Sequence, residues 1–323
     1  MITGIGALKG ISIRGIGNLK GITIKSGGHS SGGNRVSIIK KYGGKYRQVP
    51  YINEYIKEIA EENRCHTFIE LTGGGGRTIL NLPTFEMDGN IYKFGRKIYN
   101  EYDRGLCNLF NCVKDPIKVQ KLKALLINLG RDEGLYKYAI DNKSNKDINE
   151  LLSAAFTYMT AMLSWSGNCQ KESYLRGKTE EEARKIETAY FRKIKQLPTK
   201  SYHLRDIEII NGDYKPLLEK YGADPKVLKY IDPPYHPITR NQNGLDIYDL
   251  EWSVDDHKKL VKQLLKSRSW ILSGYDPLVW GCEDYLPLEK AGAKKVNLGV
   301  FRNGTNSTET SKFNKEEYLW IMK

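Results

Sequence analysis

Short apolar runs alternate along this chain with longer segments of helical period. Runs rich in isoleucine, valine, leucine and aromatic residues predict strands. These lie at 66–71, 96–101, 206–210, 227–231, 270–273, 296–301 and 317–322. Apolar residues spaced three and four apart predict helices at 51–62, 119–129 and 254–266. This alternation is typical of an α/β fold with a mainly parallel sheet, and we expect the last two strands to pair antiparallel at its edge.

The stretch from 130 to 200 changes character. It is rich in lysine and glutamate, has a helical period and carries scattered aromatic residues. The strand pattern resumes only at 206–210, so this block interrupts the sheet after its second predicted strand. We therefore expect one domain formed by 36–114 and 201–323, with an inserted, mainly helical domain at 115–200.

The N-terminus is repetitive. The segment GIGALKGISIR at 4–14 is followed by GIGNLKGITIK at 15–25, and a Gly/Ser-rich stretch comes next at 26–34. Two copies of a glycine-rich unit are too few for a solenoid, so the pattern predicts a flexible basic arm and linker over 1–35. An arm that contacts phosphates or anchors a partner is the alternative.

The charge balance is concentrated near that arm. The 323 residues carry 51 lysines and arginines against 38 acidic residues, which gives a net charge of +13. Residues 1–49 hold nine of the basic residues and no acid, so the remaining chain has 42 basic against 38 acidic residues. Net charge alone is therefore weak support for a nucleic-acid partner, and that case depends on the motifs.

Composition and spacing exclude several classes of protein. No apolar run of about 18 residues predicts a membrane span, and no apolar signal core begins the chain. We therefore expect a cytoplasmic protein of a bacterial or phage-infected cell. Five cysteines without a CxxC pair argue against a disulfide framework or a structural zinc site. The five histidines are dispersed and indicate no metal, although His236 is worth testing because it follows the motif described next.

The tetrapeptide Asp232-Pro233-Pro234-Tyr235 directly follows the predicted strand 227–231. Adjacent prolines remove two N–H donors and hold the backbone extended, so the loop displays acceptors at a strand end. Such a loop suits a planar amine: the adenine NH2 could donate one hydrogen to the Asp232 carboxylate and one to the Pro233 carbonyl. Tyr235 could stack on the flipped-out base. The alternative is a rigid turn with a surface tyrosine.

A run of four glycines, Gly73 to Gly76, follows the strand predicted at 66–71. Consecutive glycines allow a ligand to approach the backbone closely, but the run has neither a dinucleotide-binding spacing nor the GK[ST] of a phosphate loop. A plain glycine-rich turn remains the alternative. Glu101 ends the next predicted strand, where an acid could accept hydrogen bonds from ribose hydroxyls or act as a solvated cap.

In their order and spacing, these motifs resemble the Dam-like family of S-adenosylmethionine-dependent DNA adenine-N6 methyltransferases. The resemblance covers about residues 38 to 323. It rests on YGGK (42–45), FIELTGGGG (68–76), NEYDRGLCNLF (100–110), NGDY (211–214) and DPPY (232–235). It implies a Rossmann-like sheet with helices on both faces, and a target-recognition role for the inserted domain. The implied reaction is direct in-line methyl transfer to adenine N6 in duplex DNA, by a site-specific enzyme of restriction-modification type.

The resemblance also implies roles for individual residues. Asp232, Pro233, Pro234 and Tyr235 would be catalytic. The S-adenosylmethionine site would comprise Tyr42 and Lys45 at the methionine end, Glu70, Gly73 and Gly75 along the methionine moiety, Glu101 at the ribose, and Asp213 and Tyr214 near the adenine. In one departure, Leu71-Thr72 stands where the family commonly has Pro-Phe.

Basic residues of the inserted domain are candidates for DNA phosphate contacts. They are Arg176, Lys178, Arg192 and Lys193. Glutamates share this stretch, so a solvated amphipathic helix is the alternative. The insert lacks the Arg/Asn/Gly hairpin of GATC-reading members, which leaves the target sequence open. We expect duplex DNA as partner, a monomeric protein and, as a possible companion, a cognate restriction endonuclease.

Three other functions are left open from the residues alone. Another amine, cytosine N4 or adenine in RNA, could be the acceptor, and the chain could be a catalytically silent DNA-binding relative. A protein glutamine amide is disfavoured because that chemistry usually has Asn at the position of Asp232.

Overall fold

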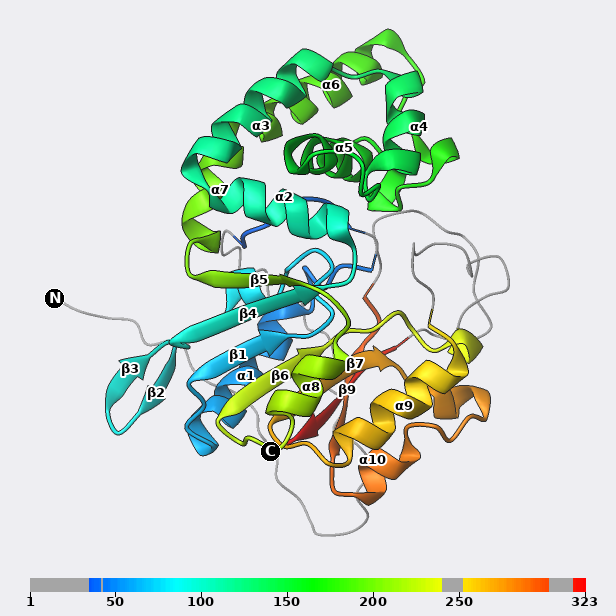
Figure 1. Cartoon of the computed structure of the whole chain (residues 1–323). Coiled ribbons are helices and arrows are strands. Elements are labelled where there is room, and N and C mark those ends of the chain that lie inside the picture. Colours follow the sequence, from blue (N-terminus) through cyan, green and yellow to red (C-terminus); the bar gives the residue numbers. More distant parts are fainter. Residues whose placement is uncertain (1–34, 42, 240–251, 302–315) are drawn as a thin grey trace, which may run out of the picture.

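The computed structural model describes residues 35–41, 43–239, 252–301 and 316–323. The predicted arm at 1–35 lies outside this range except for Arg35, and so does Tyr42. The described chain forms a seven-stranded sheet in the order β5-β4-β1-β6-β7-β9-β8 (Figure 1). Its strands are β1 Thr67–Glu70, β4 Arg96–Glu101, β5 Ile207–Asn211, β6 Val227–Ile231, β7 Trp270–Tyr275, β8 Lys294–Gly299 and β9 Glu317–Met322.

The first five strands of that order run parallel, and β9 runs antiparallel between β7 and β8. The α/β prediction with an antiparallel pair at the edge is therefore confirmed. The strands predicted at 96–101, 227–231 and 317–322 have those bounds in the structure, whereas β8 starts two residues earlier than predicted. The prediction missed a short hairpin, β2 Phe85–Met87 with β3 Asn90–Tyr92.

Helices cover both faces of the sheet because side chains alternate along each strand. On β1, Phe68 belongs to the cluster that contains α1, whereas Ile69 belongs to the cluster that contains α8, α9 and α10. These helices are α1 Val49–Glu62, α8 Lys215–Tyr221, α9 Val254–Leu264 and α10 Leu286–Lys290. Helix α9 begins with a capping box, in which the side chains of Ser253 and Asp256 each accept a hydrogen bond from the backbone N–H of the other residue.

Six helices lie between β4 and β5 in the chain and stack beyond the β5 edge of the sheet (Figure 1). They are α2 Arg104–Lys114, α3 Pro116–Leu129, α4 Glu133–Asn142, α5 Glu150–Met162, α6 Glu180–Lys195 and α7 Leu197–Leu204. Helix α5 is the centre of this block, because all ten residues from Ser153 to Met162 are buried. No described helix is both long and apolar enough to cross a membrane.

Candidate active site

A cavity of about 710 Å³ opens at the carboxyl ends of β1, β4, β5 and β6. Ligands of open α/β sheets bind at this edge. The loops after these strands supply most of the lining, and the segment before α1, the connection between α4 and α5 and the start of α9 supply the rest. Every predicted cofactor-binding or catalytic residue within the described range lines this one cavity: Lys45, Glu70, Gly73, Gly75, Glu101, Asp213, Tyr214, Asp232, Pro233, Pro234 and Tyr235.

Lys45 joins the two ends of the DPPY motif. Its Nζ lies 2.7 Å from Asp232 Oδ1 and 2.7 Å from the Tyr235 hydroxyl. Burial alone would lower the pKa of Lys45, but the carboxylates of Asp232 and Glu317 raise it well above its usual value. Lys45 therefore stays charged, and its ammonium holds the carboxylate and the phenol in fixed positions.

Glu317 completes this cluster, and sequence reasoning did not single it out. Its carboxylate lies 3.3 Å from Lys45 Nζ and accepts hydrogen bonds from the Tyr235 hydroxyl at 2.9 Å and from Ser273 Oγ at 2.9 Å. Glu317 begins β9, which pairs with β7 out of chain order. The sequence signal was an acid at the start of an otherwise apolar strand, where a buried charge needs partners.

The Asp232 carboxyl group has an unusual electrostatic environment. Burial raises its pKa to about 6, Lys45 opposes this shift, and Glu317 adds to it. Its backbone N–H donates to Thr72 Oγ1 at 2.8 Å, which ties the DPPY loop to the loop after β1. Thr72 stands where the resembled family commonly has phenylalanine, and here its hydroxyl fixes the backbone of Asp232.

Tyr235 is half-buried and does not lie free on the surface. Its ring packs on Tyr275, with centroids 4.2 Å apart and planes inclined by 42°. Lys45 Nζ lies 4.8 Å from the centroid of the same ring. The phenol is thus held at its hydroxyl and along its ring, which argues against the alternative of a mere surface tyrosine.

The glycine run and Glu101 form one wall of the cavity. A side chain at Gly73 would collide with the ring of Tyr99, because a Cβ there would lie 2.2 Å from that ring. Glu101 accepts hydrogen bonds from Gly74 N at 2.5 Å and from Asp103 N at 2.9 Å. Burial raises the pKa of Glu101, and these two hydrogen bonds do not fully reverse that effect.

Three other predicted cofactor residues have mainly local partners. Glu70 accepts from Ile79 N at 3.1 Å, and burial raises its pKa to about 8, so it is largely protonated at neutral pH. Asp213 accepts from Lys215 N at 2.9 Å at the start of α8. Tyr214 is buried and stacks on Trp252 at 4.9 Å. All three still line the cavity.

The four basic residues predicted to contact DNA lie outside the cavity lining, although another lysine of the insert, Lys146, is part of it. Arg176 forms a bidentate ion pair with Glu133, in which Nε lies 2.6 Å and Nη2 lies 2.5 Å from the two carboxylate oxygens. Arg192 and Lys193 are exposed near the end of α6. The pKa of Lys193 is lowered, first by partial desolvation and then by the positive charges of Lys40, Arg77, Arg192 and Lys200. Lys193 therefore belongs to a basic cluster shared by the insert and the segment beside the cavity.

Comparisons with known proteins add independent findings. Residues 42–276 match the model of the D12 class of N6 adenine-specific DNA methyltransferases. The Type II methyltransferase M.MjaIII of Methanocaldococcus jannaschii is 22% identical over 234 residues, which cover 70% of this chain and 78% of that protein. The matched region contains the cavity loops after β1, β4, β5 and β6. These findings favour adenine in DNA over cytosine, RNA or a silent relative.

Proposed function

Because this chain belongs to the D12 class of N6 adenine-specific DNA methyltransferases, we propose that its cavity binds S-adenosylmethionine and that the DPPY loop presents adenine to it. The observation that carries the proposal is the cluster of Lys45, Asp232, Tyr235 and Glu317 on the cavity wall. It fixes an acceptor and an aromatic ring beside the space for a cofactor.

The lining of the cavity fits this cofactor. Gly73 lets the Tyr99 ring pack directly against the backbone of the cavity wall, and at Gly74 in the same wall a Cβ would meet no atom within 4 Å. Asn100 Oδ1 is buried and has no hydrogen-bond partner within the described part of the chain, so an acceptor is left for a bound donor. Glu101 and Asp213 add carboxylates that suit ribose hydroxyls and a cationic ligand.

The residues of the DPPY loop would act mainly by positioning. S-adenosylmethionine supplies a methyl group that is already activated by a positive sulfonium. Asp232 would accept one hydrogen of the adenine amine and the Pro233 carbonyl the other, so that the nitrogen lone pair turns out of conjugation with the ring. As the new N–C bond replaces the bond between the methyl group and sulfur, whose electron pair stays on sulfur, the amine loses a proton that the Asp232 carboxylate can accept. Tyr235 would stack on the flipped base.

The DNA would lie across the insert and the mouth of the cavity. The cluster of Lys40, Arg77, Arg192, Lys193 and Lys200 supports this path, because the positive charges of the other four residues lie close enough to lower the pKa of Lys193. Arg176 is a weaker candidate than the sequence suggested, since Glu133 already neutralises it. Lys178 remains a candidate without a specific supporting contact. The target-recognition role of 115–200 is part of this proposal.

The assembly and partners are also proposals. A chain that carries both a cofactor cavity and a target-recognition insert can act as a monomer, which light scattering of the purified protein would test. The resemblance to a protein named as a Type II methyltransferase suggests a companion restriction endonuclease. Protection of methylated DNA from that nuclease would test this point.

The decisive experiment uses the full chain, duplex DNA and S-adenosylmethionine labelled in its methyl group. After hydrolysis of the DNA to nucleosides, we expect the label in N6-methyladenine. Label found only in cytosine, transfer to RNA alone, or no transfer by folded protein would contradict the proposal. Sequencing of the methylated positions would then give the target site.

A further inference from the structure

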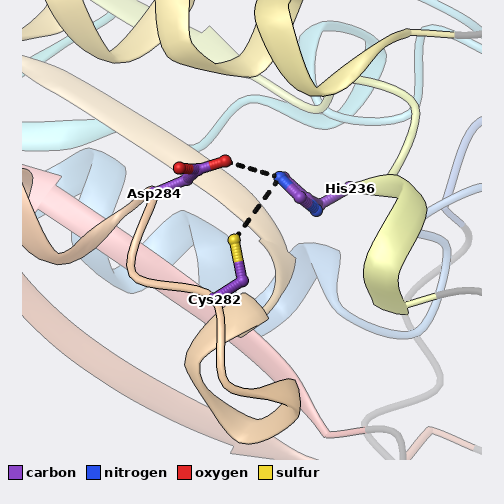
Figure 2. A group of neighbouring side chains, drawn as sticks. All are labelled: His236, Cys282 and Asp284. Atoms are coloured by element: carbon purple, nitrogen blue, oxygen red, sulfur yellow. Dashed lines mark hydrogen bonds and ion pairs between the residues drawn. The ribbon is translucent and has the colours of Figure 1, made fainter.

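A second group of reactive side chains lies outside the cavity lining. His236 follows the DPPY motif, and Cys282 and Asp284 come from the connection between β7 and α10 (Figure 2). His236 Nε2 lies 3.1 Å from Asp284 Oδ2 and 3.9 Å from Cys282 Sγ. The three potential ligand atoms all lie within 4.8 Å of one another. We propose that His236, Cys282 and Asp284 form a site for Zn²⁺.

The geometry distinguishes a metal site from a catalytic triad. In a Cys–His–Asp relay, the thiol contacts one ring nitrogen and the acid contacts the other. Here both the thiol and the carboxylate face the same nitrogen, Nε2, as Figure 2 shows. Three ligand atoms that converge from different side chains surround a common point, which is what an ion requires and a proton relay does not.

The chemistry of the donors selects the metal. Imidazole nitrogen, thiolate sulfur and a carboxylate oxygen are the three ligand types that Zn²⁺ takes in proteins. Calcium and magnesium ions prefer sites made of oxygen ligands alone. Only one of the three donor atoms here is an oxygen, so these two ions are disfavoured. Three protein ligands leave a fourth tetrahedral position for water. Because Cys282 and Asp284 are only partly buried, an ion can reach the site from solvent.

Binding would require two local changes. The Cys282 thiol must lose its proton, which passes to the buffer, because the thiolate is the ligand. His236 must present the lone pair of Nε2, so Nδ1 would carry the ring proton. A protonated Nδ1 could no longer accept the hydrogen bond from Ile238 N, a bond that is already long at 3.3 Å. Lys258 Nζ lies 3.8 Å from the other oxygen of Asp284 and would compete electrostatically with the ion.

The consequence of such a site is structural. The ion would join the segment that directly follows Tyr235 to the loop between β7 and α10, two segments separated by 46 residues. Packing already holds this region, because the His236 ring lies 4.8 Å from the ring of His257. A bound ion would therefore fix the exit of the DPPY loop without entering the reaction.

The test is a titration of the full chain, kept reduced and first treated with a chelator, with Co²⁺ as a spectroscopic probe for Zn²⁺. We expect one equivalent of Co²⁺ to produce a thiolate charge-transfer band and the strong visible absorption of a four-coordinate ion. Stoichiometric Zn²⁺ should abolish both bands. Absence of these bands, or their persistence after Zn²⁺ is added, would overturn the proposal.

Variants assign the ligands. Cys282→Ser should lose the charge-transfer band, whereas Cys169→Ser should keep it, because Cys169 is also partly exposed but lies outside the cluster. Lys258→Ala should tighten Co²⁺ binding about threefold by removing the competing cation. Far-ultraviolet dichroism of each variant verifies the fold. A band that survives in folded Cys282→Ser would refute the site, as would its loss in Cys169→Ser alone.

Discussion

At the scale of single residues, the Asp232 carboxyl group is the candidate catalytic group, and we expect its ionisation to control how activity depends on pH. Burial raises its pKa to about 6, even though Lys45 stabilises the charged form at 2.7 Å. The proposed reaction needs the ionised carboxylate, because only that form accepts a hydrogen bond with either oxygen. Ionisation of this one group should therefore set the acid limb of the activity.

We expect kcat/KM for methyl transfer to rise as the pH increases through about 6 and to level off above it. Below that pH the protonated carboxyl group donates a hydrogen bond where it must accept one. Rates measured at fixed ionic strength, with DNA affinity recorded at each pH, would check this. A profile that is flat across the same interval, in the absence of a change in DNA binding, would contradict it.

Glu317 provides a second test at this scale. Glu317→Gln removes the charge that faces Lys45 and weakens an acceptor of the Tyr235 hydroxyl. Because hydrogen bonds to charged groups contribute about 1.5–3 kcal/mol, we expect methyl transfer to fall by about 10- to 100-fold. S-adenosylmethionine affinity from calorimetry should change little.

The matched control is Glu316→Gln, in the neighbouring position. Within the described part of the chain, Glu316 accepts hydrogen bonds from Asn297 and Tyr318 and does not contact the side chains clustered around Lys45. Its variant should retain near-normal activity. If the two variants lost the same amount of methyl-transfer activity, the loss would come from changing the start of β9 and not from changing the cluster around Lys45.

At the scale of elements, the DPPY loop is held by its neighbour in the sheet. β1 and β6 are adjacent and parallel, so the loops after them emerge side by side. The hydrogen bond from Asp232 N to Thr72 Oγ1 connects these loops at 2.8 Å. We therefore expect Thr72, which stands where the resembled family commonly has phenylalanine, to position the backbone of Asp232.

We expect Thr72→Val to lower kcat for methyl transfer by about tenfold with little change in stability, because it keeps the shape of the side chain but removes the acceptor. Thr72→Ser, which keeps the hydroxyl, should restore most of the rate. Single-turnover kinetics would separate this effect from product release. If valine and serine were equally active, the hydrogen bond would have no part in positioning Asp232.

The elements best predicted from sequence were those with a clear local period. The strands at 227–231 and 317–322 are apolar and bounded by turn residues or polar segments, so their ends are locally determined. The hairpin of β2 and β3 was missed although Asp88-Gly89 occupies its turn, because its strands are only three residues long. Helix α2 was read as part of a motif and not as an element.

Only those residues of the candidate site that belong to contiguous sequence motifs could be predicted from the sequence. The DPPY and glycine motifs are contiguous in sequence, so their residues could be named before the fold was known. Glu317 could not, because its contact with Tyr235 spans 82 residues and depends on the insertion of β9 between β7 and β8. The grouping of His236 with Cys282 likewise arises from tertiary structure.

At the scale of the whole molecule, two groups of basic residues in the sequence are candidates for contacts with DNA. One is the basic cluster around Lys193, which includes the cavity-lining residue Arg77. The other is the N-terminal segment 1–34, which lies outside the described residues and contains four basic residues and no acid. The two groups predict different effects on DNA binding.

Deletion of residues 1–34 should leave S-adenosylmethionine affinity unchanged and make the dependence of DNA affinity on salt less steep. Each phosphate contact contributes about 0.9 to the slope of log K against log salt, so the slope should fall by up to about three to four. Fluorescence anisotropy at several salt concentrations would measure it. An unchanged slope would assign the arm the role of a tether.

The central claim is that Asp232 orients the adenine amine in a cavity that binds the cofactor independently of it. The most direct measurement compares wild-type protein and Asp232→Ala for methyl transfer to adenine in duplex DNA, with S-adenosylmethionine affinity from calorimetry. Lys45 keeps Glu317 as its partner in the variant, so the fold should persist. We predict that transfer falls by about 100-fold or more while cofactor affinity stays within about threefold of wild type. A variant that binds the cofactor and transfers methyl at the wild-type rate would contradict the account.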